Sequence, residues 1–284
     1  MILVTGATSN VGREVVGQLA AAGREVRAFT RDPDRVADIG PSVKTVTGDL
    51  AQPETLRAAL AGVERVFALS GGGPEQPLHD ANLAQAAAEA GVRHVVKMSV
   101  IGAEYGFGDL MSTWHLAGER AIRQVGLPWT FLRPGEFMSN ARLWAATVKS
   151  QGVVYWPHGH VKVAVIDPRD IAALAVAALT SPGHEGKAYR ISGPEALTVG
   201  ERVGTLGAAL GRALRHVEIP VSAARDAAAR AGRQPLVVET ALTNMGSDDY
   251  RVPYAQVLPV SRDVLGREPR TFAEWAADHI GLFR

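Results

Sequence analysis

The stretch that decides the fold lies at the start of the chain and reads Val4-Thr5-Gly6-Ala7-Thr8-Ser9-Asn10-Val11-Gly12. It joins a predicted strand over residues 2–5 to a predicted helix over residues 12–22. Gly6 permits a tight turn, and Gly12 permits the helix to pack closely against the strand. N–H groups at the start of such a helix bind a pyrophosphate, so the turn predicts a dinucleotide site at Gly6, Thr8, Ser9, Asn10, Val11 and Gly12. The alternative is an ordinary glycine-rich βα turn.

Beyond this turn, short apolar runs alternate with alanine-rich stretches. The predicted strands cover residues 2–5, 25–30, 43–47, 65–69, 92–99 and 129–133, and further helices cover 53–60, 78–90 and 113–125. Strands separated by helices of about ten residues are typical of parallel βαβ units. The sequence therefore predicts an α/β fold with a doubly wound, Rossmann-type sheet, which favours the dinucleotide interpretation of the first turn.

After Pro134 the alternation loosens. Strands are predicted at 153–156, 161–166 and 188–192, and helices at 170–179, 198–210, 222–231, 235–245 and 271–282. We therefore predict an NAD(P)-binding domain over residues 1–134. A smaller, mostly helical substrate-binding or lid region over residues 135–284 is expected to pack on the carboxyl edge of the sheet.

Composition excludes several classes of function. The 284 residues include 46% apolar and 21% charged side chains, with a formal net charge of +1, which argues against a nucleic-acid surface. The chain has no cysteine, and its eight histidines lack HExxH-like spacing, so no metal site is predicted. The apolar run 171–179 is too short to span a bilayer. We expect a cytoplasmic protein with a small-molecule substrate; a homo-oligomer is left open.

Motifs spread along the chain resemble those of the NmrA-like family. They are GATSNVG at 6–12, Gly48-Asp49-Leu50, Leu132-Arg133-Pro134-Gly135 with Phe137-Met138, Asp170-Ile171-Ala172 and Ser192-Gly193-Pro194-Glu195. The family consists of atypical short-chain dehydrogenase/reductases and includes NADPH-quinone reductases and redox-sensing regulators. The resemblance extends to about residue 275. One departure is Ser9, where the family usually has glycine; serine is small enough for the turn and can hydrogen-bond phosphate.

Cofactor choice depends on the residues that follow the second predicted strand. The resemblance implies that Arg31 binds the 2′-phosphate of NADP, and the guanidinium fork suits that group. A surface arginine paired with Asp32 or Asp34 is the alternative, and Asp32 would instead suit the ribose of NAD. The sequence thus favours NADPH and leaves NAD open. The resemblance also places Asp49 and Leu50 along the adenine, although Asp49 can equally cap the next helix.

The candidate catalytic residues lie on the predicted helix over residues 113–125 and beside it. His115 and Glu119 stand four residues apart, at the two positions where related dehydrogenases carry a Tyr-xxx-Lys pair. His115 is a candidate proton donor, and Glu119 a candidate to orient it or raise its pKa. The resemblance places the Ser99 hydroxyl near the nicotinamide. The alternatives are two polar residues on a partly exposed helix and a serine that caps a strand end.

Residues after the sixth predicted strand complete the expected pocket. The resemblance places Pro134 and Gly135 against the cofactor, and Phe137 and Met138 in the nicotinamide pocket, although both side chains are equally compatible with a core. Tyr105, in the glycine-bounded loop 102–108, is a further pocket candidate, and such a loop can act as a lid.

The predicted function is an NADPH-dependent oxidoreductase that passes hydride to a small electrophile such as a quinone or enone. Acceptors of this kind need little acid catalysis, which suits a site without Tyr-xxx-Lys. The alternative is an NADP(H)-binding redox sensor without turnover. An epimerase or dehydratase that uses bound NAD is a weaker third interpretation, since such enzymes usually keep the tyrosine and lysine.

Overall fold

The computed structural model describes residues 1–36, 39–40, 43–232 and 234–284, and the chain divides into two compact units. The first unit contains Met1–Arg133, Pro168–Arg190 and Asp263–Gly266, and the second contains Pro134–Asp167, Ile191–Arg262 and Arg267–Arg284. The chain thus returns twice to the first unit after Pro134. The predicted single boundary at 134/135 lies one residue after the first of these crossings, and the prediction does not include the later ones.

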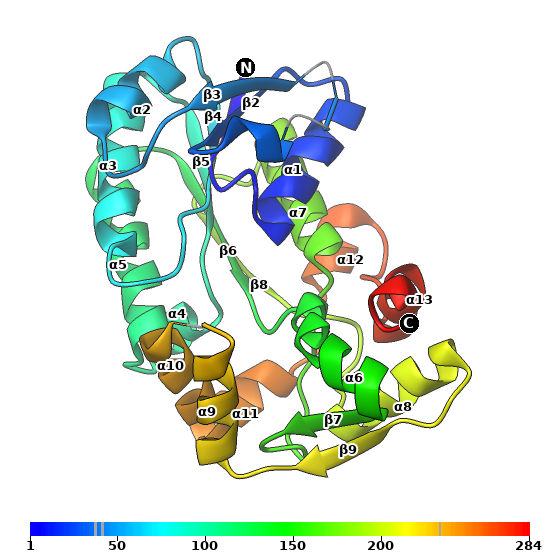
Figure 1. Cartoon of the computed structure of the whole chain (residues 1–284). Helices are drawn as coiled ribbons and strands as arrows, with labels where there is room; N and C mark the ends of the chain where they lie inside the picture. Colours follow the sequence, from blue (N-terminus) through cyan, green and yellow to red (C-terminus); the bar gives the residue numbers. More distant parts are fainter. Residues whose placement is uncertain (37–38, 41–42, 233) are drawn as a thin grey trace. The chain divides into compact units, whose positions relative to one another are not determined.

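The first unit is built on a seven-stranded sheet with the order β3-β2-β1-β4-β5-β6-β8 (Figure 1). The strands are β1 (Ile2–Val4), β2 (Val26–Thr30), β3 (Val43–Thr47), β4 (Arg65–Ala68), β5 (His94–Met98), β6 (Trp129–Pro134) and β8 (Lys187–Ile191). Every pairing from β3 to β6 is parallel. The strand order reverses between β1 and β4, and ligands of doubly wound sheets bind at such a switch point. The predicted Rossmann-type fold is confirmed.

Helices cover both faces of this sheet (Figure 1). On one face α1 (Asn10–Ala21) packs against α7 (Pro168–Thr180). On the other, α3 (Gln76–Glu89) packs against both α2 (Pro53–Leu60) and α5 (Leu110–Gln124). The core beneath α2, α3 and α5 consists of buried apolar side chains that include Leu3, Leu60, Leu83, Val95 and Phe131. Short elements complete the unit: η1 (Pro33–Val36), α4 (Gly102–Tyr105) and part of α12 (Val260–Leu265).

The second unit is mainly helical, as predicted for the later part of the chain. It contains η2 (Met138–Trp144), α6 (Ala145–Gln151), α8 (Val199–Leu210), α9 (Val221–Arg230), α10 (Pro235–Gly246), α11 (Asp248–Ala255), α13 (Phe272–Asp278) and η3 (Ile280–Leu282). Strands β7 (Val153–Trp156) and β9 (Arg215–Glu218) form a separate parallel pair.

Two strand predictions differ from the structure. Residues 161–166 form no strand and make isolated bridges, from Val163 to Leu197 and from Ile166 to Phe137. Their side chains are buried apart from Lys162. The apolar pattern therefore arises from burial, and these residues do not pair continuously with a neighbouring strand. Strand β9 has no counterpart among the predicted strands, because its sequence Arg-His-Val-Glu is mostly polar.

Candidate cofactor and active site

The turn between β1 and α1 has the backbone shape that a pyrophosphate site needs. Gly6 has a φ of +62°, in the left-handed region. A Cβ on Gly6 would meet the Leu69 carbonyl oxygen at 2.8 Å, and a Cβ on Gly12 would overlap the Gly6 carbonyl group. Both positions therefore require glycine. The N–H groups of the first helical turn have no partner inside the helix, and such groups bind phosphate oxygens.

Ser9 is the N-cap of α1, and its Oγ accepts a hydrogen bond from the Gly12 backbone N–H at 3.0 Å. The hydroxyl still has a proton to donate. A hydrogen bond from Ser9 to phosphate stays a prediction, but the residue has a structural role that the sequence interpretation does not include. Of the other predicted turn residues, Val11 is buried, Thr8 is half-buried and Asn10 is exposed.

The residues after β2 favour the NADP interpretation of the site. Arg31 is exposed, and within the described part of the chain it forms no ion pair with Asp32 or Asp34. Asp32 is engaged locally, since its Oδ1 accepts from the Asp34 backbone N–H at 3.2 Å. Neither of these two carboxylates therefore competes with a 2′-phosphate for the guanidinium of Arg31.

The residues after β3 form a hydrogen-bonded turn. The Asp49 Oδ1 accepts from the Ala51 N–H at 3.0 Å, and the Asp49 N–H donates to the Thr55 Oγ1 at 3.1 Å. Asp49 therefore stabilises the turn before α2 and does not cap the helix, whose N-cap is Gln52. The second carboxylate oxygen leaves room for the predicted contact with adenine, which stays a prediction, and Leu50 beside it is half-buried.

One buried network of hydrogen bonds joins Ser99, at the carboxyl end of β5, to Glu119 of α5 and to Arg133, at the carboxyl end of β6. The Ser99 Oγ donates to the Glu119 Oε1 at 2.7 Å. Arg133, at the end of β6, donates to both oxygens of Glu119, from Nε at 2.9 Å and from Nη2 at 2.6 Å. Glu119 is 0% exposed and Arg133 is 7% exposed. Arg133 also pairs with Glu104 of α4. Glu119 is therefore an acceptor whose charge is balanced by Arg133.

His115 lies in a second network, between α3 and β5. The Gln76 Nε2 donates to the His115 Nδ1 at 3.0 Å, which leaves the ring proton on Nε2. Burial, with a smaller contribution from the charge of Lys97, lowers the pKa of His115 to about 3, although a hydrogen bond with the Met98 backbone raises it. Lys97 is itself buried and pairs with Asp80 at 2.6 Å. His115 is therefore neutral near pH 7.

The expected partnership between His115 and Glu119 is wrong. Both residues lie on α5 four positions apart, but Glu119 bonds to Ser99 and Arg133, whereas His115 bonds to Gln76. Glu119 is not among the groups that shift the pKa of His115. The pKa of His115 moves downward instead.

The low pKa of His115 predicts acid sensitivity. The unfolded chain takes up the proton near the ordinary value of 6.5 and the folded chain near 3, so stability falls as the pH drops through this window. At pH 4.5 the loss is on the order of 2 kcal/mol. His115→Gln removes this loss, so its melting temperature should fall less between pH 7 and pH 4.5 than that of the wild type. Replacement of the exposed His160 with Gln is the control; equal acid sensitivity in all three proteins would contradict the assignment.

Tyr105 ends α4 and is 37% exposed. It stacks on Phe107 with 5.5 Å between ring centroids, and the Arg190 guanidinium donates to its hydroxyl. With Glu104 bound to Arg133, the segment is held at two neighbouring strands, β6 and β8. Tyr105 therefore belongs to a tethered segment. Its predicted contact with substrate stays a prediction.

The remaining predicted residues belong to the second unit, which begins at the buried Pro134. The Gly135 N–H donates to the Ile191 carbonyl at 3.1 Å. Met138 is 0% exposed, which fits the core alternative that the sequence left open, and its assignment to the pocket stays a prediction. Phe137 is half-buried, and its assignment to the pocket stays a prediction.

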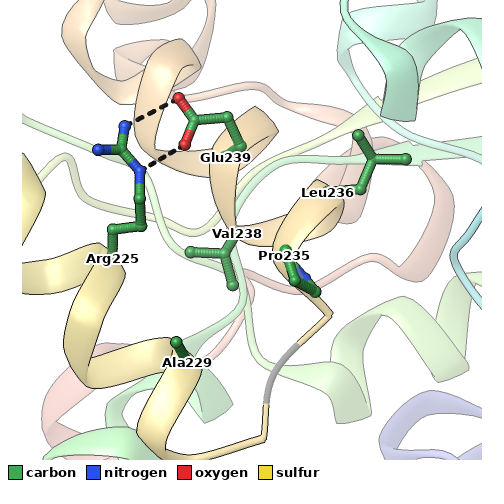
Figure 2. Close-up of a pocket in the computed structure, with 6 residues that line it drawn as sticks. All are labelled: Arg225, Ala229, Pro235, Leu236, Val238 and Glu239. Atoms are coloured by element: carbon green, nitrogen blue, oxygen red, sulfur yellow. Dashed lines mark hydrogen bonds and ion pairs between the residues drawn. The ribbon is translucent and has the colours of Figure 1, made fainter.

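Figure 2 shows a pocket of about 310 Å³ between α9 and α10 of the second unit. The walls are mainly apolar, and Arg225 forms a bidentate ion pair with Glu239 across it, at 2.7 and 3.0 Å. The lining residues are Arg225, Ala229, Pro235, Leu236, Val238 and Glu239. The sequence predicts none of them to bind cofactor or substrate, so this pocket shares no residue with the candidate site.

The sequence interpretation misses four buried polar residues of the two networks, namely Gln76, Asp80, Lys97 and Arg133. One signal is available, because Lys97 interrupts the apolar run of β5. A charged residue in a doubly covered strand needs a buried partner. Arg133 stands in a quoted motif without an assigned role. Among the described residues no cluster could hold a metal ion, and no helix is long and apolar enough to cross a membrane.

A β1–α1 turn that requires glycine, at the switch point of a parallel sheet, defines the class of NAD(P)-binding Rossmann proteins. A family model described as NAD(P)H-binding matches residues 6–182, and the chain belongs to this family. The predicted NmrA-like resemblance is confirmed at the level of the fold, which a solved NmrA variant shares at a TM-score of 0.76 and 20% identity, covering 98% of this chain and 94% of its own.

Relatives along the whole chain are reductases. A Streptomyces griseus protein named (4-alkanoyl-5-oxo-2,5-dihydrofuran-3-yl)methyl phosphate reductase is 44% identical over 284 residues, covering 100% of this chain and 99% of its own. An NAD(P)H azoreductase of Xenophilus azovorans is 39% identical, with the same coverage. An Escherichia coli NADPH-dependent quinone oxidoreductase, solved with NADPH, shares the fold at a TM-score of 0.85 and 22% identity, covering 99% of this chain and 100% of its own. The protein is an NAD(P)H-dependent oxidoreductase.

Proposed function

We propose that the protein reduces an electron-poor conjugated double bond, in an enone or a quinone, with NADPH. Bound NADPH supplies the hydride. The protein binds and orients the two reactants, and the anion formed on the acceptor takes its proton from water. Because a conjugated carbonyl group stabilises that anion, the reduction needs little acid catalysis.

The observation that carries this proposal is the state of the candidate proton donors. His115 is neutral; its Nδ1 accepts from Gln76, and its imidazole also hydrogen-bonds to the Met98 backbone. The proton of the Ser99 hydroxyl is held by Glu119. With both groups engaged, an isolated carbonyl, whose reduction needs an acid at the oxygen, is disfavoured as a substrate. A conjugated acceptor suits the site.

The relatives support the same class of acceptor. The name of the Streptomyces griseus reductase describes a dihydrofuran ring that carries oxo and alkanoyl groups, and the Escherichia coli protein of the same fold is a quinone oxidoreductase. The absence of an available proton on His115 or Ser99 also suits a redox sensor that binds NADP(H) without turnover. The two reductases that are 44% and 39% identical over the whole chain favour the enzyme.

The experiment that tests the function is NADPH oxidation by the purified protein with a panel of acceptors. Quinones and unsaturated lactones should be reduced faster than saturated ketones of similar size. The pH profile of kcat should contain no limb assignable to His115 between about pH 5 and 8, and His115→Ala should lower kcat by a few-fold at most. A loss of ~10²-fold or more would restore the predicted acid role of His115. NADPH binding without oxidation of any acceptor would favour the sensor.

Arg31 is proposed to select NADPH through the 2′-phosphate. Arg31→Ala should weaken NADPH binding by roughly 10- to 100-fold, because a charge-assisted contact is lost, and should leave NADH binding almost unchanged. Titration calorimetry with both nucleotides measures this. Arg35→Ala, which removes another exposed arginine after the same strand, is the matched control. Equal losses for both nucleotides, or no loss for either, would defeat the assignment.

A further inference from the structure

Ser99 has a hydroxyl whose hydrogen-bond direction is determined by its neighbours. The residue follows β5 and is 3% exposed, and its backbone N–H donates to the Leu132 carbonyl at 2.7 Å. Its Oγ lies 2.7 Å from the Glu119 Oε1. One of these two oxygens must supply the proton between them.

Arg133 decides which oxygen is the donor. Its Nε–H and Nη2–H groups approach the Oε1 and the Oε2 of Glu119, at 2.9 and 2.6 Å. A guanidinium can only donate, so both carboxylate oxygens accept. Arg123 adds a further positive charge 3.5 Å from the same carboxylate. Glu119 therefore carries no proton toward Ser99, and the Ser99 hydroxyl is the donor.

A serine hydroxyl has one proton and two lone pairs. With the proton directed to Glu119, Ser99 presents only lone pairs to any ligand that reaches it. It can accept from an N–H or O–H group. It cannot donate to a carbonyl oxygen or to a developing oxyanion.

The sheet order places the nicotinamide half of the cofactor on the side of Ser99. The pyrophosphate site begins at β1, and Arg31 and Asp49 follow β2 and β3, on one side of it. The adenosine half therefore extends toward β2 and β3, and the other half toward β4 and β5, across the switch point. Ser99 stands at the carboxyl end of β5, two strands from β1, or about 10 Å at the usual strand spacing.

We propose that Ser99 accepts a hydrogen bond from the carboxamide N–H of the bound nicotinamide and donates none to the substrate. Glu119 and Arg133 act as positioning residues, because they hold the hydroxyl proton away from the ligand. One consequence of this inference, that the substrate receives no proton from Ser99, rests on the proposed function. The binding contact itself is independent of the substrate.

The probe is the acetylpyridine analogue of NADP⁺, in which a methyl group replaces the carboxamide NH₂. The wild type should bind NADP⁺ more tightly than the analogue by roughly 3- to 10-fold, the effect of one neutral hydrogen bond. Ser99→Ala should weaken NADP⁺ binding by that factor and leave the analogue unchanged, so the preference disappears. Ser99→Cys should behave in the same way, because a thiol is a weak acceptor.

Ser112→Ala is the matched control. Ser112 is also 3% exposed, and its hydroxyl donates to a carboxylate, that of Asp109. This variant should keep the full preference for NADP⁺. A preference that survives in both Ser99 variants would overturn the proposal. So would a loss of turnover of ~100-fold in Ser99→Ala with unchanged affinity for both nucleotides, because it would mark Ser99 as a proton donor. If no acceptor is reduced, the proposed function fails while the binding comparison still tests Ser99.

Discussion

Gly12→Val is expected to abolish binding of NADPH and NADH alike. A Cβ at this position would overlap the Gly6 carbonyl oxygen, with the carbonyl carbon 2.8 Å away and the Ser9 Oγ 3.0 Å away. The helix can accept the side chain only by moving away from the turn, which displaces the N–H groups that face the phosphates. Titration calorimetry or nucleotide fluorescence measures the loss.

Gly17→Val supplies a control within the same helix. Gly17 lies in α1, and a Cβ there would meet no described atom within 4 Å apart from its chain neighbours and the nearby backbone of its own helix. This variant should bind both nucleotides with nearly wild-type affinity, and valine has a slightly higher helix propensity than the glycine it replaces. Circular dichroism confirms that both proteins are folded. A folded Gly12→Val protein with wild-type affinity for NADPH would show that the cofactor binds elsewhere.

Arg133→Met should destabilise the protein by about 3–5 kcal/mol, because it leaves the fully buried carboxylate of Glu119 without its bidentate partner. The melting temperature should fall by on the order of 6–12 °C. The double variant Arg133→Met, Glu119→Leu should recover much of this loss, since it removes the unpaired charge.

Arg225→Met is the matched comparison. It breaks another bidentate arginine–glutamate pair, whose two side chains are each 49% exposed. Because solvent screens such a pair, its melting temperature should change little. Equal losses for Arg133→Met and Arg225→Met would mean that burial does not make the Arg133–Glu119 pair important. A failure of the double variant to recover stability would contradict the same explanation.

The elements that the sequence predicts well are those specified by local pattern. The strands of the first unit and the helices between them have clear periodicity, and the glycines of the first turn have a steric role that acts over a few residues. The errors occur where the hydrophobic pattern of the sequence does not match the pairing of strands in the structure. Residues 161–166 are apolar because they are buried, and the polar β9 is a strand because β7 pairs with it.

The candidate site divides in the same way. Residues proposed to bind through the backbone or by their place at a strand end, such as Gly6, Gly12 and Arg31, follow from the sequence. The partners of His115 and Glu119 do not, because helical spacing shows which residues share a face and not what lies opposite each of them. Met138 is a similar case, because its position in the motif suggests a pocket residue, whereas its complete burial is typical of a core residue.

The parallel fold, the glycine turn and the arginine after β2 can all be predicted from the chain alone, since each depends on neighbours a few residues away. The protonation chemistry of the site cannot, because it depends on contacts between distant segments. Burial among other elements, with a smaller contribution from the charge of Lys97, makes His115 neutral, and Arg133 of β6 makes Glu119 an acceptor. Charges and hydrogen bonds in a buried site depend on distance in space, which the order of residues along one helix does not contain.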